Sequence, residues 1–155
     1  MNDTSNWLVH DHQRYESALD ECEIYAGAGD WKDAIRIFYE FVDDLKLHMR
    51  MEDEVLYPFF VEETGDPEDE ITALGDEHDN LARLLSDLAS VIKAKDFDHF
   101  EDSLIPLKNA MALHNRHEEA VLQRMGGDSM LTRRNEILDR LKSLGTNEVQ
   151  RAWEF

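Results

Sequence analysis

The sequence contains a single cysteine, Cys22. Without a second thiol, an intrachain disulfide is excluded, and so is a zinc or iron–sulfur site built from cysteines. Scarcity of cysteine is typical of proteins that reside in a reducing compartment. The polar residues 1–6 also lack the basic and apolar regions of a secretory signal. We therefore expect the protein to be cytoplasmic.

Basic residues are scarce as well. The chain has 16 Lys and Arg against 35 Asp and Glu, which gives a net charge of −19. Binding to nucleic acid needs clustered basic side chains that displace counterions from phosphates, so we expect no nucleic-acid partner. No apolar run approaches the length of a membrane-spanning helix, and we expect no membrane association through such a helix.

Glycine and proline are few, and five of the seven glycines lie at the predicted breaks. Between the breaks, apolar residues recur with the period of a helix, which predicts four long helices and a shorter fifth, Met130 to Leu144. Short connections make neighbouring helices antiparallel. The pattern predicts an all-α, up-down-up-down four-helix bundle over residues 1–125, with a C-terminal helix and tail over residues 126–155. The predicted breaks are Gly27-Ala28-Gly29-Asp30, Thr64-Gly65-Asp66-Pro67, Ala94-Lys95-Asp96 and Gly126-Gly127-Asp128.

Local signals support two of the predicted helix starts. Asp30 is suited to cap the second helix, with Asp33 three residues further on. Asp66 followed by Pro67 and three acidic residues is typical of the start of the third helix, because proline fits the first turn and negative charge favours the positive end of the helix dipole.

Four histidines follow a duplicated spacing. His12 and His48 are 36 residues apart, His78 and His114 are also 36 apart, and the second pair repeats the first at an offset of 66. Each histidine lies 18 residues from the turn of its own hairpin, or roughly 27 Å at about 1.5 Å per residue. The spacing therefore predicts that all four reach one level of the bundle.

The second histidine of each pair begins the same short motif, His-x-x-x-Glu, at His48–Glu52 and again at His114–Glu118. Residues four apart share one face of a helix, so each pair can offer nitrogen and oxygen to one point. A single motif of this kind is more often a surface ion pair. Here both copies lie in apolar stripes, and burying these groups without a metal would be costly. We therefore interpret the following residues as metal ligands: His12, His48, Glu52, His78, His114 and Glu118.

These motifs resemble the hemerythrin-like, or HHE cation-binding, family over residues 7 to 125. The resemblance includes Leu56-Tyr57-Pro58 after the first His-x-x-x-Glu and Glu77-His78 in the second half. It implies two iron ions, held by the histidines and bridged by the two glutamates and an oxo or hydroxo group. Manganese or zinc is a less favoured occupant of such a donor set.

The ligand pattern of this chain differs from that of the oxygen-carrying hemerythrins. Those have a fifth histidine four residues after the one on the third helix, where this chain has Ala82, and an aspartate where it has Glu119. Two histidines per iron, two bridging carboxylates and an oxo bridge would leave each metal about five-coordinate. The sequence thus predicts an open position on both metals, as in iron-sensing, nitric-oxide-reactive and iron-centre-repair relatives. The repair proteins also carry a short cysteine-bearing N-terminal domain, so we expect the repair role to be less favoured for this chain.

The remaining histidines and two tyrosines are candidates for additional ligands or for neighbours of the site. His10 lies about 200° around the helix from His12 and cannot face the same site. His117, three residues after His114, is either a spare ligand or an outer neighbour of the site. Tyr15 and Tyr57 are candidates to hydrogen-bond a ligand, although packing is the commoner role for a tyrosine. His99 is expected at the surface.

Three classes of function remain open. The first is a di-iron protein that binds a small diatomic ligand, O2 or NO, for sensing, storage or protection. The second is a di-iron enzyme that consumes O2, peroxide or NO, or a donor of iron to damaged iron centres. The third is an interaction module or homo-oligomer that docks through the C-terminal helix. Glu-x-x-His and His-Glu-x-x-His are both absent, which disfavours a ferritin-type centre and zinc hydrolysis.

Overall fold

The computed structural model describes residues 4–64, 69–132 and 139. All of its regular elements are helical, which confirms the predicted all-α class. In chain order they are α1 (Thr4–Gly27), α2 (Trp31–Met51), η1 (Glu52–Leu56), α3 (Tyr57–Thr64), α4 (Asp69–Lys93), η2 (Phe97–His99) and α5 (Phe100–Thr132). Among these helices, none combines the length and the apolar content needed to cross a membrane.

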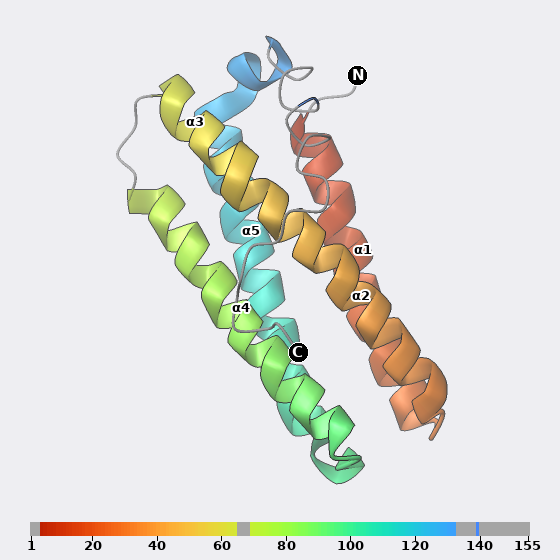
Figure 1. Cartoon of the computed structure of the whole chain (residues 1–155). Coiled ribbons are helices and arrows are strands. Elements are labelled where there is room, and N and C mark those ends of the chain that lie inside the picture. Colours follow the sequence, from red (N-terminus) through yellow and green to blue (C-terminus); the bar gives the residue numbers. More distant parts are fainter. Residues whose placement is uncertain (1–3, 65–68, 133–138, 140–155) are drawn as a thin grey trace.

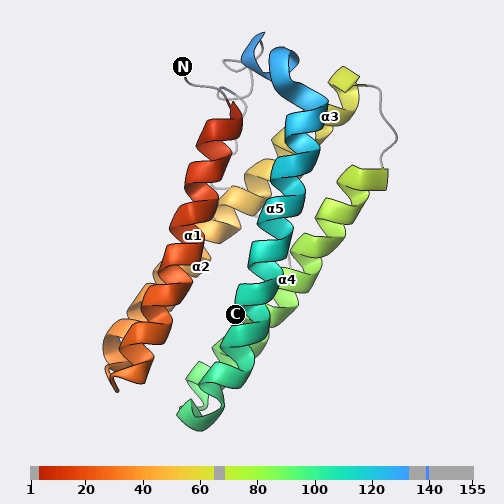
Figure 2. The same ribbon diagram turned by 180° about the vertical axis from the view of Figure 1, so that it is seen from behind.

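The long helices lie side by side along most of their length, as the two opposite views show (Figure 1, Figure 2). The most extensive contacts join α1 to α2, α4 to α5, and α1 to α5. The turn between α1 and α2 and the turn between α4 and α5 lie at the same end of the molecule (Figure 1). Trp31 and Phe97, which are one repeat apart, stack at that end with ring centroids 3.9 Å apart.

The two turns have the same hydrogen bonds. In the first, Asp30 N donates to Tyr25 O and Gly29 N donates to Ala26 O; in the second, Asp96 N donates to Val91 O and Lys95 N to Ile92 O. This is the Schellman motif, which ends a helix through one residue with positive φ. Gly29 holds that position with φ 79°, and Lys95 holds it with φ 56°. The 66-residue repeat of the sequence is therefore also a repeat of backbone structure.

The lysine in the second turn leads to a prediction about stability. A side chain at positive φ costs roughly 1–2 kcal/mol, and glycine avoids this cost while adding flexibility to the unfolded chain. We expect Lys95→Gly to stabilise the protein by up to about 1 kcal/mol and Gly29→Ala to destabilise it by about 1 kcal/mol. Urea unfolding of the two variants measures both effects, and a loss of stability in Lys95→Gly would contradict the argument.

Two predicted helix boundaries are confirmed, and one is wrong. The Asp30 side chain accepts a hydrogen bond from Asp33 N at 3.3 Å, as expected of a cap, and α4 ends at Lys93 before the predicted break. At Gly126-Gly127-Asp128, however, α5 continues to Thr132. Glycine disfavours a helix by only about 1 kcal/mol, so neighbouring turns can carry the helix through. The predicted start at Asp66-Pro67 and the predicted fifth helix beyond Thr132 lie outside the described residues, apart from Asp139.

One feature of the second helix was not predicted. α2, η1 and α3 follow one another without a break, and η1 is a π-helical turn in which Tyr57 N–H donates to Glu52 O, five residues earlier. Pro58 follows at once. Proline has no N–H to donate, and in a regular helix its ring meets the carbonyl four residues before it. The widened turn ends just before Tyr57 and Pro58, and its first residue, Glu52, is also the last residue of the repeated motif His48–Glu52.

The core surrounds a buried polar layer. On the side of the two turns, a large apolar cluster includes Phe38, Leu45, Leu85, Leu107 and Met111. Further along the helices, beyond the histidines, a separate set of apolar side chains is also buried: Val55, Leu56, Ile71, Leu74 and Val121. Four histidines and two glutamates lie between these two apolar regions, where unpaired charge is costly.

Candidate metal centre

The six side chains expected to bind metal converge inside the helices. His12 comes from α1, His48 from α2, Glu52 from η1, His78 from α4, and His114 and Glu118 from α5. None is more than 5% exposed. They form two groups whose potential ligand atoms lie within 4.8 Å of one another. The first group is His12, His48, Glu52 and Glu118, and the second group is Glu52, His78, His114 and Glu118.

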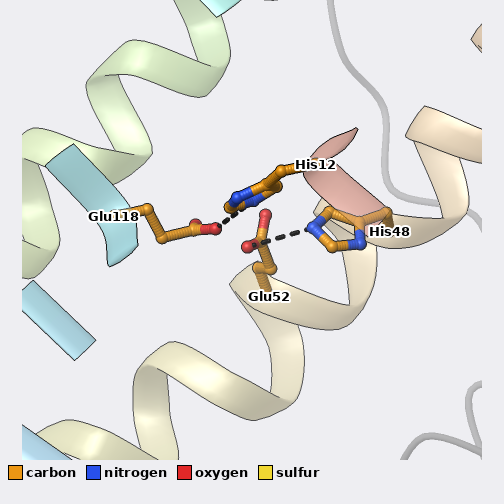
Figure 3. Close-up of side chains that lie close together, drawn as sticks. All are labelled: His12, His48, Glu52 and Glu118. Carbon is orange, nitrogen blue, oxygen red and sulfur yellow. Dashed lines mark hydrogen bonds and ion pairs between the residues drawn. The ribbon is translucent and has the colours of Figure 1, made fainter. Parts of the chain in front are cut away.

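The two glutamates belong to both groups. Each glutamate directs one carboxylate oxygen to the first group and the other oxygen to the second group. Glu52 Oε2 lies 3.2 Å from His48 Nε2, and Glu52 Oε1 lies 3.2 Å from His78 Nε2. Glu118 Oε1 lies 2.8 Å from His12 Nε2, and Glu118 Oε2 lies 3.6 Å from His114 Nε2. Figure 3 shows the first group, in which Glu118 pairs with His12 and Glu52 pairs with His48. This is the arrangement that two carboxylates need in order to bridge a pair of cations.

A second layer of carboxylates holds the outer nitrogen of every histidine. The Nδ1 atoms lie 2.7–3.0 Å from carboxylate oxygens, in the pairs His12–Glu119, His48–Asp11, His78–Asp53 and His114–Glu77. Carboxylates only accept hydrogen bonds, so each Nδ1 donates its proton outward and each Nε2 faces the centre. Outer partners of this kind fix the ring orientation of histidines that bind metals.

These four acids were not assigned from the sequence, although a signal was present. Asp11 and Glu77 immediately precede His12 and His78, and Asp53 and Glu119 immediately follow Glu52 and Glu118. Each acid hydrogen-bonds a histidine on another helix, never the histidine beside it in the chain. Sequence spacing indicates that the acids recur with the repeat, but only the packing of helices identifies their partners.

The donor set fits cations better than it fits an empty centre. His78 Nε2 and His114 Nε2 face each other at 3.2 Å. Two ring nitrogens at this distance form a hydrogen bond only when one carries a proton and the other a lone pair, and they repel each other when both carry a proton. Glu52 Oε2 is buried and accepts no hydrogen bond from the described residues. A cation in each group would satisfy these atoms, and nitrogen with oxygen donors suits first-row metals.

Without a metal, the same neighbours make the histidines strongly basic. Burial lowers the pKa of each imidazole, but the surrounding carboxylates outweigh burial and raise the pKa of all four. The pKa of His48 and that of His114 both reach about 10. Burial raises the pKa of Glu118, yet hydrogen bonds with neighbours that include His114 and His12 hold it well below its usual value. Metal binding must therefore displace protons.

This gives a prediction about pH. The ordinary pKa of histidine is 6.5, and that of His48 or His114 in the folded protein is about 10. Because a raised pKa stabilises the folded state below the unfolded value, the contribution is complete below about pH 6.5 and disappears as the pH rises towards 10. We expect the chelated protein to lose thermal stability steadily between pH 7 and pH 10. Metal affinity should change in the opposite direction, since fewer protons compete at high pH.

Thermal unfolding in EDTA at several pH values measures this effect. The variant His48→Gln should flatten the pH profile, whereas His10→Gln should leave it unchanged, because His10 is exposed on α1 and lies outside the centre. A gain in stability of the chelated wild-type protein between pH 7 and pH 10 would contradict the conclusion that the buried histidines are protonated when no metal is bound.

A further prediction concerns the outer carboxylates. Glu119 is 33% exposed and bonds His12 Nδ1 at 2.7 Å, so Glu119→Ala should release the His12 ring without disturbing the core. Loss of such a partner typically weakens metal binding by about 10–100-fold. Competition with a chelator of known affinity measures the change. Glu21→Ala, an equal loss of charge at an exposed position of α1, should have no effect; equal affinities for the two variants would contradict the role of Glu119.

Tyr57 lies among the ligands of the second group. Its hydroxyl donates to Glu118 Oε2 and lies 3.2 Å from His78 Nε2. In a regular α-helix, a residue five positions after Glu52 would point about 140° away from it. The π-helical turn of η1 brings Tyr57 back towards the face that carries Glu52. The sequence singled out Tyr57 as a candidate neighbour of the site, but the turn that directs it inward was not predicted.

Tyr15 and the remaining histidines lie around the centre without entering it. The Tyr15 ring packs edge-on against His48 with centroids 5.2 Å apart, while its hydroxyl points to Asp44 O. His10 is exposed, as expected from its place on the helix. His117 Nδ1 bonds Glu77 at 2.6 Å, so it adds to the outer layer and does not reach the six inner residues.

A small hollow adjoins the first group. Its lining includes His12, His48, Glu52 and His114, together with apolar side chains and the ring of Tyr15. The apolar side chains are Leu45, Met49 and Met111, which belong to the core cluster on the side of the turns. The space next to the first group therefore has a largely apolar wall.

Comparison with known families gives a match that covers most of the chain. The model of the hemerythrin HHE cation binding domain matches residues 3–125. Comparisons with curated proteins and with solved structures gave no significant match. The matched region contains both histidine pairs, both glutamates and all four outer carboxylates. The chain belongs to the hemerythrin HHE cation-binding domain family.

Proposed function

We propose that the protein is a non-haem di-iron protein that binds a small diatomic ligand, O2 or NO, for sensing, storage or protection. The observation that carries this proposal is that two buried carboxylates each face both histidine pairs. Such carboxylates are suited to bridge two metals, and the family is a cation-binding one. We propose iron as the metal, because it suits a mixture of imidazole and carboxylate ligands. Manganese and zinc are less favoured.

Each residue has a separate role in the proposed centre. His12 and His48 would hold one iron and His78 and His114 the other, through Nε2 in each case. Glu52 and Glu118 would bridge the pair and neutralise much of its charge. When bound, the iron pair supplies one electron from each metal and a coordination position for the diatomic ligand.

The rest of the chain prepares the site for such a ligand. The outer carboxylates fix the four rings before metal binds, so little ordering is needed at that step. Leu45, Met49 and Met111 line the adjoining hollow. Apolar walls exclude water and favour an uncharged diatomic molecule over polar solutes.

Ligand titration of the iron-loaded protein tests the proposal. The protein is loaded with Fe(II) under argon and titrated with NO or O2, and the ligand is then removed by purging. We expect saturable binding in proportion to the iron pair, followed by return of the starting spectrum. Failure to bind two irons per chain, or no spectral change with either ligand, would contradict it. Repeated consumption of O2, peroxide or NO with a reductant would instead support the enzyme.

The finer topology belongs to the same proposal. Two hairpins with their turns at one end support an up-down-up-down antiparallel bundle around the centre (Figure 1). The use of the C-terminal segment for docking a partner or a second copy stays a prediction. Deleting residues 133–155 and measuring oligomer size in the reduced and oxidised states tests it.

A further inference from the structure

The two metal groups differ chemically although the sequence repeats. At the 66-residue offset, the counterpart of Tyr57 is Gln123, which is exposed on α5. Tyr57 itself is only 4% exposed and lies inside the centre. The counterpart of Pro58 is Arg124, and the helix around it has no π-helical turn. The tyrosine, the proline and the widened turn therefore occur together in one half of the repeat.

The Tyr57 oxygen faces the second group. It lies 3.2 Å from His78 Nε2, and it contacts Glu118 Oε2, which is the oxygen of that carboxylate nearer to His114. His78 and Glu118, the two residues that the Tyr57 hydroxyl contacts, both belong to the second group. No comparable hydroxyl reaches the first group among the described residues, because the nearby Tyr15 hydroxyl is directed to Asp44 O.

The hollow lies at the other group. Both histidines of the first group line it, as do Leu45 and Met49. Of the second group, His114 also lines it, whereas His78 and the nearby Tyr57 do not. A phenol therefore occupies space beside the second group, and an apolar hollow adjoins the first. The sequence pattern alone predicted an equal open position on both metals, and this asymmetry was not foreseen.

Building on the proposed function, we infer that Tyr57 is a further metal ligand and that the diatomic ligand binds only at the metal of the first group. Tyr57 would give the second group a fifth protein donor beside His78, His114, Glu52 and Glu118, while the first group keeps four. With one bridging oxygen shared by both metals, the second is saturated and the first retains one open position facing the hollow.

Ligation by Tyr57 is a simple substitution. The phenol O–H bond breaks, an oxygen–metal bond forms in its place, and the proton leaves to solvent. The metal is neither oxidised nor reduced in this step, so no co-reactant is required. The hydrogen bond that Tyr57 now donates to Glu118 is given up, and the Glu118 oxygen is left free to contact the same metal.

Visible and resonance Raman spectra of the iron-loaded protein test this inference. A phenolate bound to Fe(III) gives a charge-transfer band in the visible region and enhanced tyrosine vibrations. We expect both features after oxidation by ferricyanide, their complete loss in Tyr57→Phe, and their retention in Tyr15→Phe. Iron content and circular dichroism of each variant show whether it is folded and loaded. A loaded wild-type protein without the band, or a band that survives in Tyr57→Phe, would overturn the inference.

Azide titration of the oxidised protein tests where the open position lies. We expect one azide per iron pair in wild type and two in Tyr57→Phe, since removal of the phenol oxygen frees a position on the second metal. Two azides per pair in wild type would overturn the inference while leaving the di-iron proposal intact. Absence of an iron pair in wild type would instead contradict the proposed function itself.

Discussion

Glu118→Ala should abolish the metal pair. Glu118 is fully buried and provides one oxygen to each group, at 2.8 Å from His12 Nε2 and 3.6 Å from His114 Nε2. Its loss removes a shared ligand from both positions at once, so we expect the iron content to fall from two per chain to less than one. Metal analysis after anaerobic loading and desalting measures this content.

The same substitution should also weaken the metal-free fold. Removing one partner of a buried charged pair typically costs about 3–5 kcal/mol, because the other charge stays buried. Here the protonated His12 and His114 would lose their inner partner. Glu118→Gln keeps the shape of the side chain and serves as the milder variant, and Glu40→Gln at an exposed position of α2 is the control. Retention of two irons in both Glu118 variants would contradict the bridging role.

Metal removal should have the second large effect. A ligand that binds only the folded state stabilises it by about 4 kcal/mol when its free concentration is about a thousandfold above the Kd. For a chain of this size, each kcal/mol changes Tm by about 2–4 °C, so we expect loading to raise Tm by about 8–16 °C. The difference in Tm between the loaded and the metal-free protein should grow between pH 7 and pH 10, because the metal-free protein loses its histidine ion pairs in this range.

Calorimetry of the chelated and reloaded protein measures this change. The unloaded protein should still fold, because its histidines find carboxylates at both ring nitrogens, as His12 does with Glu118 and Glu119. A Tm that is the same with and without metal at saturating concentration would indicate that the ion does not bind the folded centre.

The inner centre could be predicted from sequence because helices convert spacing into position. Two equal intervals around two turns place four histidines at one level, and a spacing of four places each glutamate beside its histidine. Because the motif occurs twice, a metal site explains it better than a surface ion pair that arose by chance. These regularities depend only on helix geometry, so no knowledge of packing was required.

The rest depends on contacts between helices. The packing of the helices decides which outer carboxylate bonds which histidine. The pairs Asp53–His78 and Glu119–His12 are examples, since neither pair is close in sequence. The direction of Tyr57 depends on one widened turn. Pro58 beside it does not reveal that turn in the sequence, since Pro106 lies in α5 without one. The glycines at 126 and 127 predicted a break because glycine weakens a helix, yet the cost is too small to end one.

The most direct test of the account is a crystal structure of the iron-loaded protein with anomalous diffraction measured on both sides of the iron absorption edge. The account predicts two iron peaks between Glu52 and Glu118, one beside His12 and His48 and the other beside His78 and His114. Peaks elsewhere on the protein, or a centre in which these six side chains hold no metal, would contradict it.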